Sequence, residues 1–227
     1  IKIGKKNNIL VLEDAAESLG STMNNKQSGI FGDFSTFSFQ ATKTITTGEG
    51  GMVATKLSTE IYNKMKLYRN HGVSKEKYYH LLPGNNFRLT NLQAAIGYSQ
   101  LKRINAIKKR RMEIFLLYSN IFSKNKDIQL KKFNKNINPM VWTLSILLND
   151  KKKLQRKKLI ITMLKNYIET RNGFYSPNRL KIYKNYRDND LKVSDKISKN
   201  IICLPLYNSL SDKEVEYIAK TFMKLIN

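Results

Sequence analysis

Three side chains near the start of the sequence have the chemistry needed to hold an aldehyde cofactor. Asp14 follows the apolar run Ile9–Leu12, Lys43 stands 29 positions further on, and Ser38 lies in an aromatic and small-residue stretch just before it. A lysine amine can bind an aldehyde covalently, a carboxylate can pair with a protonated ring nitrogen, and a small hydroxyl suits a phosphate. Pyridoxal phosphate presents all three of these partners. The residues therefore favour an enzyme that uses this cofactor.

Taken singly, each of these residues has an ordinary structural explanation. A lone aspartate at a strand end is more often a capping residue, and a lone lysine in this lysine-rich chain is more often on the surface. Ser38 alone would be a small strand residue. Only the three together, in this order, favour a cofactor site.

Two expected strands position Asp14 and Ser38. Ile9–Leu12 is an unbroken apolar run with β-branched members, which is typical of a strand buried on both faces. A carboxylate at the carboxyl end of such a strand lies where open α/β sheets bind ligands. Phe34–Phe39 and Met52–Thr55 have the composition of two further short strands. The sequence thus predicts an α/β sheet that carries the candidate site at one end.

Helical patterns follow the expected strands. Thr59–Asn70 has helical spacing, and Thr90 with Gln93 has the form of a capping box that opens a long helix, expected to reach about Phe122. Further elements are expected after Lys131: strands near 141–147, a basic helix around 151–166, a strand or loop at 168–175, and a last helix with a capping box at Ser211. This order predicts a large α/β domain over residues 1–105, then a linking helix and a small α+β domain over 106–227.

The charge of the chain is strongly positive and unevenly distributed. The 227 residues carry a formal net charge of +24, yet residues 1–50 are balanced, with 5 basic and 5 acidic side chains, whereas residues 151–200 carry 15 and 4. Such a charge can indicate nucleic-acid binding, which stays open as an alternative function. The lysine-rich composition and the neutral, motif-rich first segment instead favour a solvated basic surface, with no nucleic acid as partner.

The cysteine, the apolar runs and the histidines of the sequence bear on the cell compartment, on membrane association and on metal binding. Cys203 is the single cysteine, so no internal disulfide is possible, and a reducing compartment such as the cytoplasm is favoured. The longest apolar runs are far shorter than the roughly 20 residues of a membrane-spanning helix, which predicts no membrane association. His71 and His80, with one distant cysteine, do not form a metal-binding pattern, so no metal is expected.

Several stretches of the sequence match one known pattern. The main ones are Val11–Gly20, Gly32–Phe39, Thr42–Val53 and Gly84–Gly97, and shorter ones follow at Ile168–Arg171, Phe174–Tyr175 and Cys203–Tyr207. Together they resemble the DegT/DnrJ/StrS family of pyridoxal-phosphate-dependent nucleotide-sugar aminotransferases. Gly84–Gly97 is close to the family's Gly-Tyr-Asn-Tyr-Arg-x-Thr-Asn-x-x-Ala-Ala pattern. The resemblance implies an aspartate-aminotransferase-type (fold type I) large domain with a small α+β domain. Within the family, the sequence most resembles enzymes that make 4-amino sugars such as GDP-perosamine.

The resemblance also implies roles for five residues. Lys43 matches the Schiff-base lysine and Asp14 the acid at the pyridine nitrogen. Glu17 matches a position, glutamine in many members, near the ring hydroxyl, and Ser38 matches a phosphate-binding serine. Asn86 matches an asparagine that reaches the phosphate from the neighbouring subunit, which implies a homodimer. The implied partners are an amino-acid donor, glutamate by analogy, and a keto-sugar nucleotide used in surface polysaccharide or O-antigen synthesis.

The family's large domain normally has further strands before the one that holds Asp14, including a phosphate-binding turn and an aromatic residue over the cofactor ring. Because the chain starts close to that strand, we expect it to be a C-terminal portion of such an enzyme. Alone, it is expected to bind pyridoxal phosphate poorly and to have little activity. An inactive remnant of the enzyme is the main alternative. Gln40 and Ala41, where relatives often carry a His-Pro pair, weaken only the assignment of a subclass.

Overall fold

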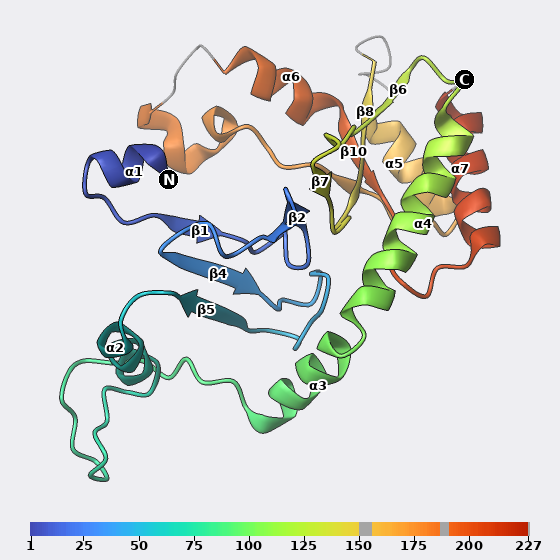
Figure 1. Ribbon diagram of the computed structural model, residues 1–227. Helices are drawn as coiled ribbons and strands as arrows, with labels where there is room; N and C mark the ends of the chain where they lie inside the picture. The colour runs from blue at the N-terminus through green and yellow to red at the C-terminus, as the bar shows by residue number, and fades with distance from the viewer. Residues whose placement is uncertain (150–155, 187–190, 227) are drawn as a thin grey trace. The chain divides into compact units, whose positions relative to one another are not determined.

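The computed structural model (Figure 1) describes residues 1–149, 156–186 and 191–226. The chain forms two compact units. Unit 1 comprises Ile1–Ile107 with Lys135–Met140, and unit 2 comprises Lys108–Asn134 with Val141–Asn227. Among the described residues, no helix has the length and apolar character needed to cross a membrane.

Unit 1 contains short strands and three helices of its own. The strands are β1 (Leu12–Asp14), β2 (Thr22–Met23), β3 (Lys26–Gln27), β4 (Phe34–Ser38), β5 (Gly51–Thr55) and β7 (Ile137–Asn138). The helices are α1 (Lys2–Lys6), α2 (Thr59–Arg69) and α3 (Asn91–Leu101), and α4 (Ile104–Phe122) begins in unit 1 and continues in unit 2. The expected strands at 34–39 and 52–55 and the expected helix at 59–70 are thereby confirmed.

The main sheet of unit 1 has the order β1-β4-β5 (Figure 1). β1 runs parallel to β4, and β5 runs antiparallel to β4. A parallel pair needs a crossover between its strands, and here the crossover contains the hairpin β2-β3. The hairpin turns at Asn24 and Asn25, whose φ angles of 50° and 60° suit asparagine better than most residues. β7 pairs with β2 and completes a small second sheet.

The prediction that Ile9–Leu12 is a strand buried on both faces is wrong. The strand is Leu12–Asp14, and the side chains of Ile9, Leu10 and Leu12 are 62%, 63% and 63% exposed. An apolar run favours burial, but whether a strand is buried depends on a covering layer. No layer covers this strand within the described chain.

The capping box of α3 is confirmed. The Thr90 hydroxyl accepts a hydrogen bond from the Gln93 backbone N–H at 3.2 Å, and the Gln93 side chain accepts one from the Thr90 N–H at 3.0 Å. The expected single helix to Phe122 is, however, divided in two. The backbone N–H of Arg103 bonds to the carbonyl of Gln100, three residues back, and this tighter turn separates α3 from α4.

Unit 2 holds a four-stranded sheet in the order β6-β8-β10-β9. Its strands are β6 (Ile128–Leu130), β8 (Leu144–Leu148), β9 (Arg171–Asn172) and β10 (Ile201–Leu204). Its helices are α5 (Arg156–Lys165), α6 (Lys192–Asn200) and α7 (Asp212–Ile226), with two short 3₁₀ segments, η2 (Pro177–Arg179) and η3 (Lys181–Tyr186). The part of the predicted basic helix at 151–155 lies outside the described residues; the rest is α5.

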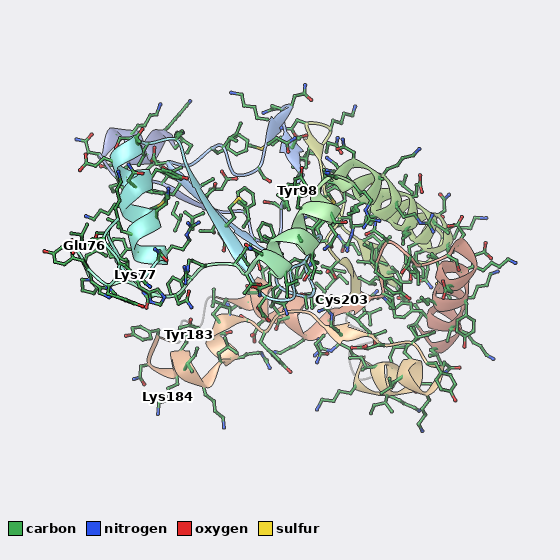
Figure 2. The ribbon with its side chains drawn as sticks, turned by 90° about the horizontal axis from the view of Figure 1, so that it is seen from below. Glu76, Lys77, Tyr98, Tyr183, Lys184 and Cys203 are labelled. Atoms are coloured by element: carbon green, nitrogen blue, oxygen red, sulfur yellow. The ribbon has the colours of Figure 1, made fainter. Side chains whose placement is uncertain are left out.

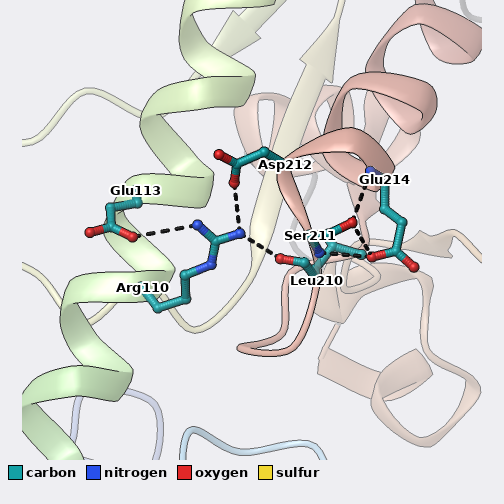
Figure 3. A network of polar contacts seen from close by, with 6 residues as sticks. All are labelled: Arg110, Glu113, Leu210, Ser211, Asp212 and Glu214. Carbon is teal, nitrogen blue, oxygen red and sulfur yellow. Dashed lines mark hydrogen bonds and ion pairs between the residues drawn. The ribbon is translucent and has the colours of Figure 1, made fainter.

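Hydrogen bonds join α4 to the start of α7 and cap α7. Arg110 on α4 bonds to the carbonyl of Leu210 at 2.6 Å and to Asp212 at 2.8 Å (Figure 3). The hydrogen bond with Asp212, and then that with Glu113, raises the pKa of the Arg110 guanidinium. Ser211 and Glu214 form the predicted capping box at the start of α7, with the Ser211 N–H donating to the Glu214 carboxylate at 2.7 Å.

Candidate active site

Asp14 and Ser38 lie on the same face of the main sheet of unit 1. The register pairs Asp14 on β1 with Thr36 on β4, and Ser38 is two residues beyond Thr36 on the same strand. Side chains of a strand alternate between the two faces, so Asp14, Thr36 and Ser38 share one face. Both candidate residues also stand at the carboxyl ends of parallel strands, where α/β sheets bind ligands.

The carboxylate of Asp14 keeps one oxygen available for a ligand. Oδ1 accepts a hydrogen bond from the backbone N–H of Ala16 at 3.0 Å, and among the described residues no group donates to Oδ2. Asp14 is exposed, whereas the neighbouring Ala15 is fully buried at 0% and anchors the turn. The strand end is therefore held by Ala15 while the carboxylate remains accessible to a cation.

Lys43 is held in a turn that follows β4. The turn begins at Gln40, whose side-chain oxygen accepts hydrogen bonds from the Thr42 N–H at 2.8 Å and the Thr42 hydroxyl at 2.7 Å. The Lys43 N–H then donates to the Gln40 carbonyl at 2.9 Å. The turn connects directly to Ser38, whose hydroxyl oxygen accepts from the Gln40 N–H at 3.3 Å. Gln40 thus shapes the segment that carries both Ser38 and Lys43.

The amine of Lys43 pairs with Glu17. Lys43 Nζ lies 3.3 Å from Glu17 Oε1, and the two side chains are 15% and 48% exposed. Of the five candidate residues, these two are in direct contact through their side chains. Glu17 follows Asp14 by three residues, so one short segment after β1 supplies both carboxylates of the candidate site.

Glu13 has a structural role that the sequence did not reveal. Its Oε1 accepts a hydrogen bond from the Gly29 N–H at 2.6 Å, and its Oε2 accepts one from the Phe31 N–H at 2.9 Å. Gly29 has a φ of +91°, and an added Cβ there would lie 2.2 Å from the Phe37 ring. Glu13 therefore fixes the crossover before β4, on the sheet face opposite Asp14. The usable signal in the sequence was that Glu13 is next to Asp14 on the same expected strand end, so its side chain must point to the other face.

Asn86 is not in contact with the other candidate residues in this chain. It is exposed in the loop between α2 and α3, and its Oδ1 accepts a hydrogen bond from Arg88 Nε at 3.4 Å. The base of the loop is tightly packed, because an added Cβ on Gly84 would lie 2.2 Å from the Gly72 nitrogen. Figure 2 shows Glu76 and Lys77 at the far end of the same loop.

The two histidines belong to this loop. His80 Nδ1 forms a hydrogen bond with the His71 carbonyl oxygen at 2.7 Å, and both residues line one shallow hollow with Pro83. Among residues 1–149, 156–186 and 191–226, no three His, Cys, Asp or Glu side chains are placed to share a metal ion.

The comparison with known families decides the class of protein. Residues 1–223 match the DegT/DnrJ/EryC1/StrS aminotransferase family. The chain belongs to this family. Its similarity extends to the curated GDP-perosamine synthase of Escherichia coli O157:H7, with 35% identity over 97% of this chain and 59% of the relative. The GDP-perosamine synthase of Vibrio cholerae is also 35% identical, over 96% of this chain and 60% of the relative.

Solved structures of family members have the same fold. Helicobacter pylori PseC, an aminotransferase involved in the biosynthesis of pseudoaminic acid, matches with a TM-score of 0.90 and 31% identity, over 99% of this chain and 62% of PseC. The PLP-form of the putative sugar aminotransferase Spr1654 from Streptococcus pneumoniae matches with a TM-score of 0.87 and 28% identity, over 100% and 60%. The chain therefore spans about 60% of the length of the relatives it matches.

Proposed function

We propose that this chain carries the catalytic lysine and the ring-binding acid of a pyridoxal-phosphate-dependent sugar aminotransferase. The observation that supports this most is the shared sheet face of Asp14 and Ser38, with the turn that bears Lys43 directly after Ser38. Family membership supplies the reaction class. The proposed reaction moves an amino group from an amino acid, glutamate by analogy, to a keto-sugar nucleotide.

The residues present fit the cofactor. The aldehyde of the cofactor requires an amine, its ring nitrogen requires a carboxylate, and its phosphate suits a small hydroxyl. The site has an amine, an ionisable carboxylate with one oxygen not engaged by the described chain, and a serine hydroxyl. Lys43 would hold the aldehyde carbon, Asp14 the ring nitrogen and Ser38 the phosphate. When bound, pyridoxal phosphate supplies an electron sink for the carbanion that forms as the α-proton leaves.

Asp14, Lys43 and Glu17 would each have a separate role in the reaction. Asp14 would face the ring nitrogen and hold a proton there, because its carboxylate attracts a positively charged ring. The Lys43 amine would act as base and then as acid, taking the proton from the donor's α-carbon and delivering it to the carbon that had carried the aldehyde. Glu17 orients that amine through the 3.3 Å contact. The lysine at position 43 thus suits transamination.

The names of several relatives support the substrate class. Besides the GDP-perosamine synthases, they include a UDP-4-amino-4,6-dideoxy-N-acetyl-beta-L-altrosamine transaminase of Helicobacter pylori, 42% identical over 55% of this chain, and the spore coat polysaccharide biosynthesis protein SpsC of Bacillus subtilis, 30% identical over 100%. We therefore assign the chain to the synthesis of amino sugars for a surface polysaccharide. The fold would be the aspartate-aminotransferase type, with the cytoplasm as the place of reaction.

The complete enzyme would need polypeptide beyond this chain. The matched relatives are longer by about two fifths of their length. In the dimeric enzyme, Asn86 would reach the phosphate of the neighbouring subunit, which agrees with its exposed position away from Lys43. The chain alone would then have little activity, and an inactive remnant is the competing explanation.

A chimeric enzyme tests the proposal. The chain is joined to the part of E. coli O157:H7 GDP-perosamine synthase that lies outside the match, and transfer of ¹⁵N from labelled glutamate to GDP- and UDP-linked keto sugars is followed by mass spectrometry. We expect ¹⁵N in the sugar product, and none with Lys43→Ala. Lys26→Ala, which changes an exposed lysine of β3, is the matched control and should leave transfer unchanged. A folded chimera without Lys43-dependent transfer would support the remnant.

A further inference from the structure

The turn that carries Lys43 is closed at its base by hydrogen bonds to Phe39. The turn runs over Gln40–Thr46, and the Phe39 carbonyl oxygen, just before it, accepts a hydrogen bond from the Thr46 hydroxyl at 3.0 Å. The same oxygen accepts one from the Thr47 backbone N–H at 2.9 Å. Lys43 thus lies in the middle of a closed turn. The position of Thr46 therefore limits where the Lys43 side chain can begin.

The side-chain amide of Gln100, on α3, binds both backbone groups of Thr46. Its Oε1 accepts a hydrogen bond from the Thr46 N–H at 3.2 Å, and its Nε2 donates to the Thr46 carbonyl at 2.7 Å. Nε2 also donates to the Ile96 carbonyl, one turn back on the same helix, at 3.0 Å. The amide oxygen and both amide hydrogens are therefore engaged, which fixes the orientation of the side chain. Gln100 joins the helix to the end of the turn.

The face of α3 that meets this segment is polar. It consists of Gln93, Gly97 and Gln100, which are half-buried at i, i+4 and i+7, whereas the other residues of the helix are exposed. Gln93 Nε2 donates to the Glu49 carbonyl at 3.2 Å. An added Cβ on Gly97 would lie 2.8 Å from Thr47 Cγ2, so the helix approaches the chain closely here. Directional contacts therefore place the segment after Lys43 against α3.

The two ends of the turn are held in different ways. Gln40, at the start, forms its side-chain hydrogen bonds with Thr42, inside the turn itself. Such local bonds keep the shape of the turn but do not set its place in unit 1. Ile45 is buried at 3% exposure, but apolar burial is non-directional. The paired hydrogen bonds from Gln100 come from a separate helix, so they set both the position and the orientation of the end of the turn.

We propose that Gln100 is a positioning residue for Lys43, which acts by holding Thr46 so that the Lys43 amine can bond to the aldehyde of the cofactor. In that step the neutral amine bonds to the aldehyde carbon and gives its two hydrogens to the aldehyde oxygen, which leaves as water. Bond formation depends steeply on the placement of the reacting atoms, so a shift of about 1 Å in the turn is enough to impair it. Gln100 acts through Thr46 and does not itself react. This inference rests on the proposed function.

Binding of two forms of the cofactor to the chimeric enzyme tests this role. Pyridoxal phosphate has the aldehyde that bonds to Lys43, whereas pyridoxamine phosphate has an amine in its place and cannot form that bond. We expect Gln100→Ala to weaken binding of pyridoxal phosphate by about tenfold, because two hydrogen bonds to the turn are lost. Binding of pyridoxamine phosphate should stay unchanged. A site that had merely lost its structure would bind both forms less well.

An isosteric variant separates the hydrogen bonds of Gln100 from its packing. Gln100→Glu should have the same selective effect as Gln100→Ala, because a carboxylate oxygen would then face the carbonyls of Thr46 and Ile96. Asn105→Asp, which makes the same exchange of amide for carboxylate at an exposed residue of α4, is the matched control. It should bind both cofactor forms as the parent does.

Hydrogen exchange of the chain without cofactor provides a second readout. The amides of Thr46 and Thr47 should exchange at least about fivefold faster in Gln100→Ala than in the parent. The positioning role is overturned if exchange is unchanged, if Gln100→Ala binds pyridoxal phosphate like the parent, or if it loses affinity for both forms equally. Absence of any bond at Lys43 in the parent chimera would remove the proposed function, and the exchange rates would still decide whether Gln100 holds the turn.

Discussion

Lys43 and Glu17 form an ion pair, with Nζ 3.3 Å from Oε1, although 26 residues separate them in sequence. The carboxylate comes from the turn after β1 and the amine from the turn after β4. These two strands are neighbours in the sheet, so their carboxyl ends meet at the same edge. The sheet thereby brings the proposed catalytic amine next to the segment that carries Asp14.

Replacing Glu17 tests whether it orients the Lys43 amine. Glu17→Gln keeps an oxygen that can accept from the amine, whereas Glu17→Ala removes it. We expect covalent trapping of pyridoxal phosphate on Lys43, measured in the chimeric enzyme, to be near the parental yield for Glu17→Gln. Glu17→Ala should lower it by up to about fivefold, because partly exposed ion pairs contribute up to about 1 kcal/mol. Equal yields for Glu17→Ala and the parent would remove the orienting role.

Arg111 is a buried cation that links α4 to other segments of unit 2. Its guanidinium, on a side chain from α4, bonds to Asn208 Oδ1 at 3.1 Å and to the carbonyls of Val141 and Trp142 at 3.2 and 2.9 Å. Burial lowers the pKa of this guanidinium. Arg111→Met should reduce the free energy of unfolding by about 1–3 kcal/mol, because buried carbonyls lose their donors. The measurement is urea unfolding of the chain.

The control for this change is Lys109→Met on the exposed side of the same helix. It should alter the free energy of unfolding by less than about 0.5 kcal/mol. If the two variants are equally stable, the hydrogen bonds of Arg111 do not stabilise unit 2.

Asp195 gives unit 2 a defined sensitivity to acid. Its carboxylate accepts hydrogen bonds from Arg179 Nε at 2.8 Å and Lys199 Nζ at 3.2 Å. The hydrogen bond from Arg179, and then that from Lys199, lowers the pKa of Asp195 from 3.8 to about 2. Because the pKa of Asp195 is lower in the folded protein, its ionised carboxylate stabilises the folded state at pH values above the pKa of the unfolded chain. This stabilisation is lost as the pH falls from about 4 through about 2.

Unfolding curves at several pH values between 5 and 2 measure this contribution. The parent should lose stability over that window more steeply than Asp195→Asn, which has no carboxylate to protonate. The difference should be small, because the pair lies on the surface. Parallel curves for the two proteins would show that the Arg179–Asp195 contact contributes nothing to stability.

The role proposed for Asn86 can be tested by mixing two inactive variants. A dimer with one Lys43→Ala subunit and one Asn86→Ala subunit has one site in which both residues are intact, if Asn86 acts across the interface. Random pairing should then restore about a quarter of the parental activity in the chimeric enzyme. Each variant alone should stay inactive, and activity no higher than that of the separate variants would place Asn86 at its own subunit's site or outside it.

Local features of the fold could be predicted from the sequence. The capping boxes at Thr90 and Ser211 depend on residues three positions apart, so their hydrogen bonds follow from the local sequence alone. The helix α2 and the strands β4 and β5 follow from periodicity in the same way. The turn at Asn24 and Asn25 was missed, although an asparagine pair suits positive φ and was a usable indication of a hairpin.

Features that depend on distant partners could not be predicted. The exposure of Leu12 is set by the absence of a covering layer in the described chain, which the apolar run itself does not encode. The contact between Lys43 and Glu17 depends on the parallel pairing of β1 with β4. The chemistry of the side chains indicated Asp14, Lys43 and Ser38, and the family resemblance added Glu17 and Asn86. The register supplies the physical reason why Asp14 and Ser38 share one face.

The most direct measurement is the identity of the residue that traps the cofactor. Pyridoxal phosphate is added to the chimeric enzyme, the product is reduced with borohydride, and the modified peptide is sequenced by mass spectrometry. We expect the phosphopyridoxyl group on Lys43, no such modification in Lys43→Ala, and less of it in Asp14→Asn. Modification spread over exposed lysines, at a level unchanged by Lys43→Ala, would contradict the proposed site.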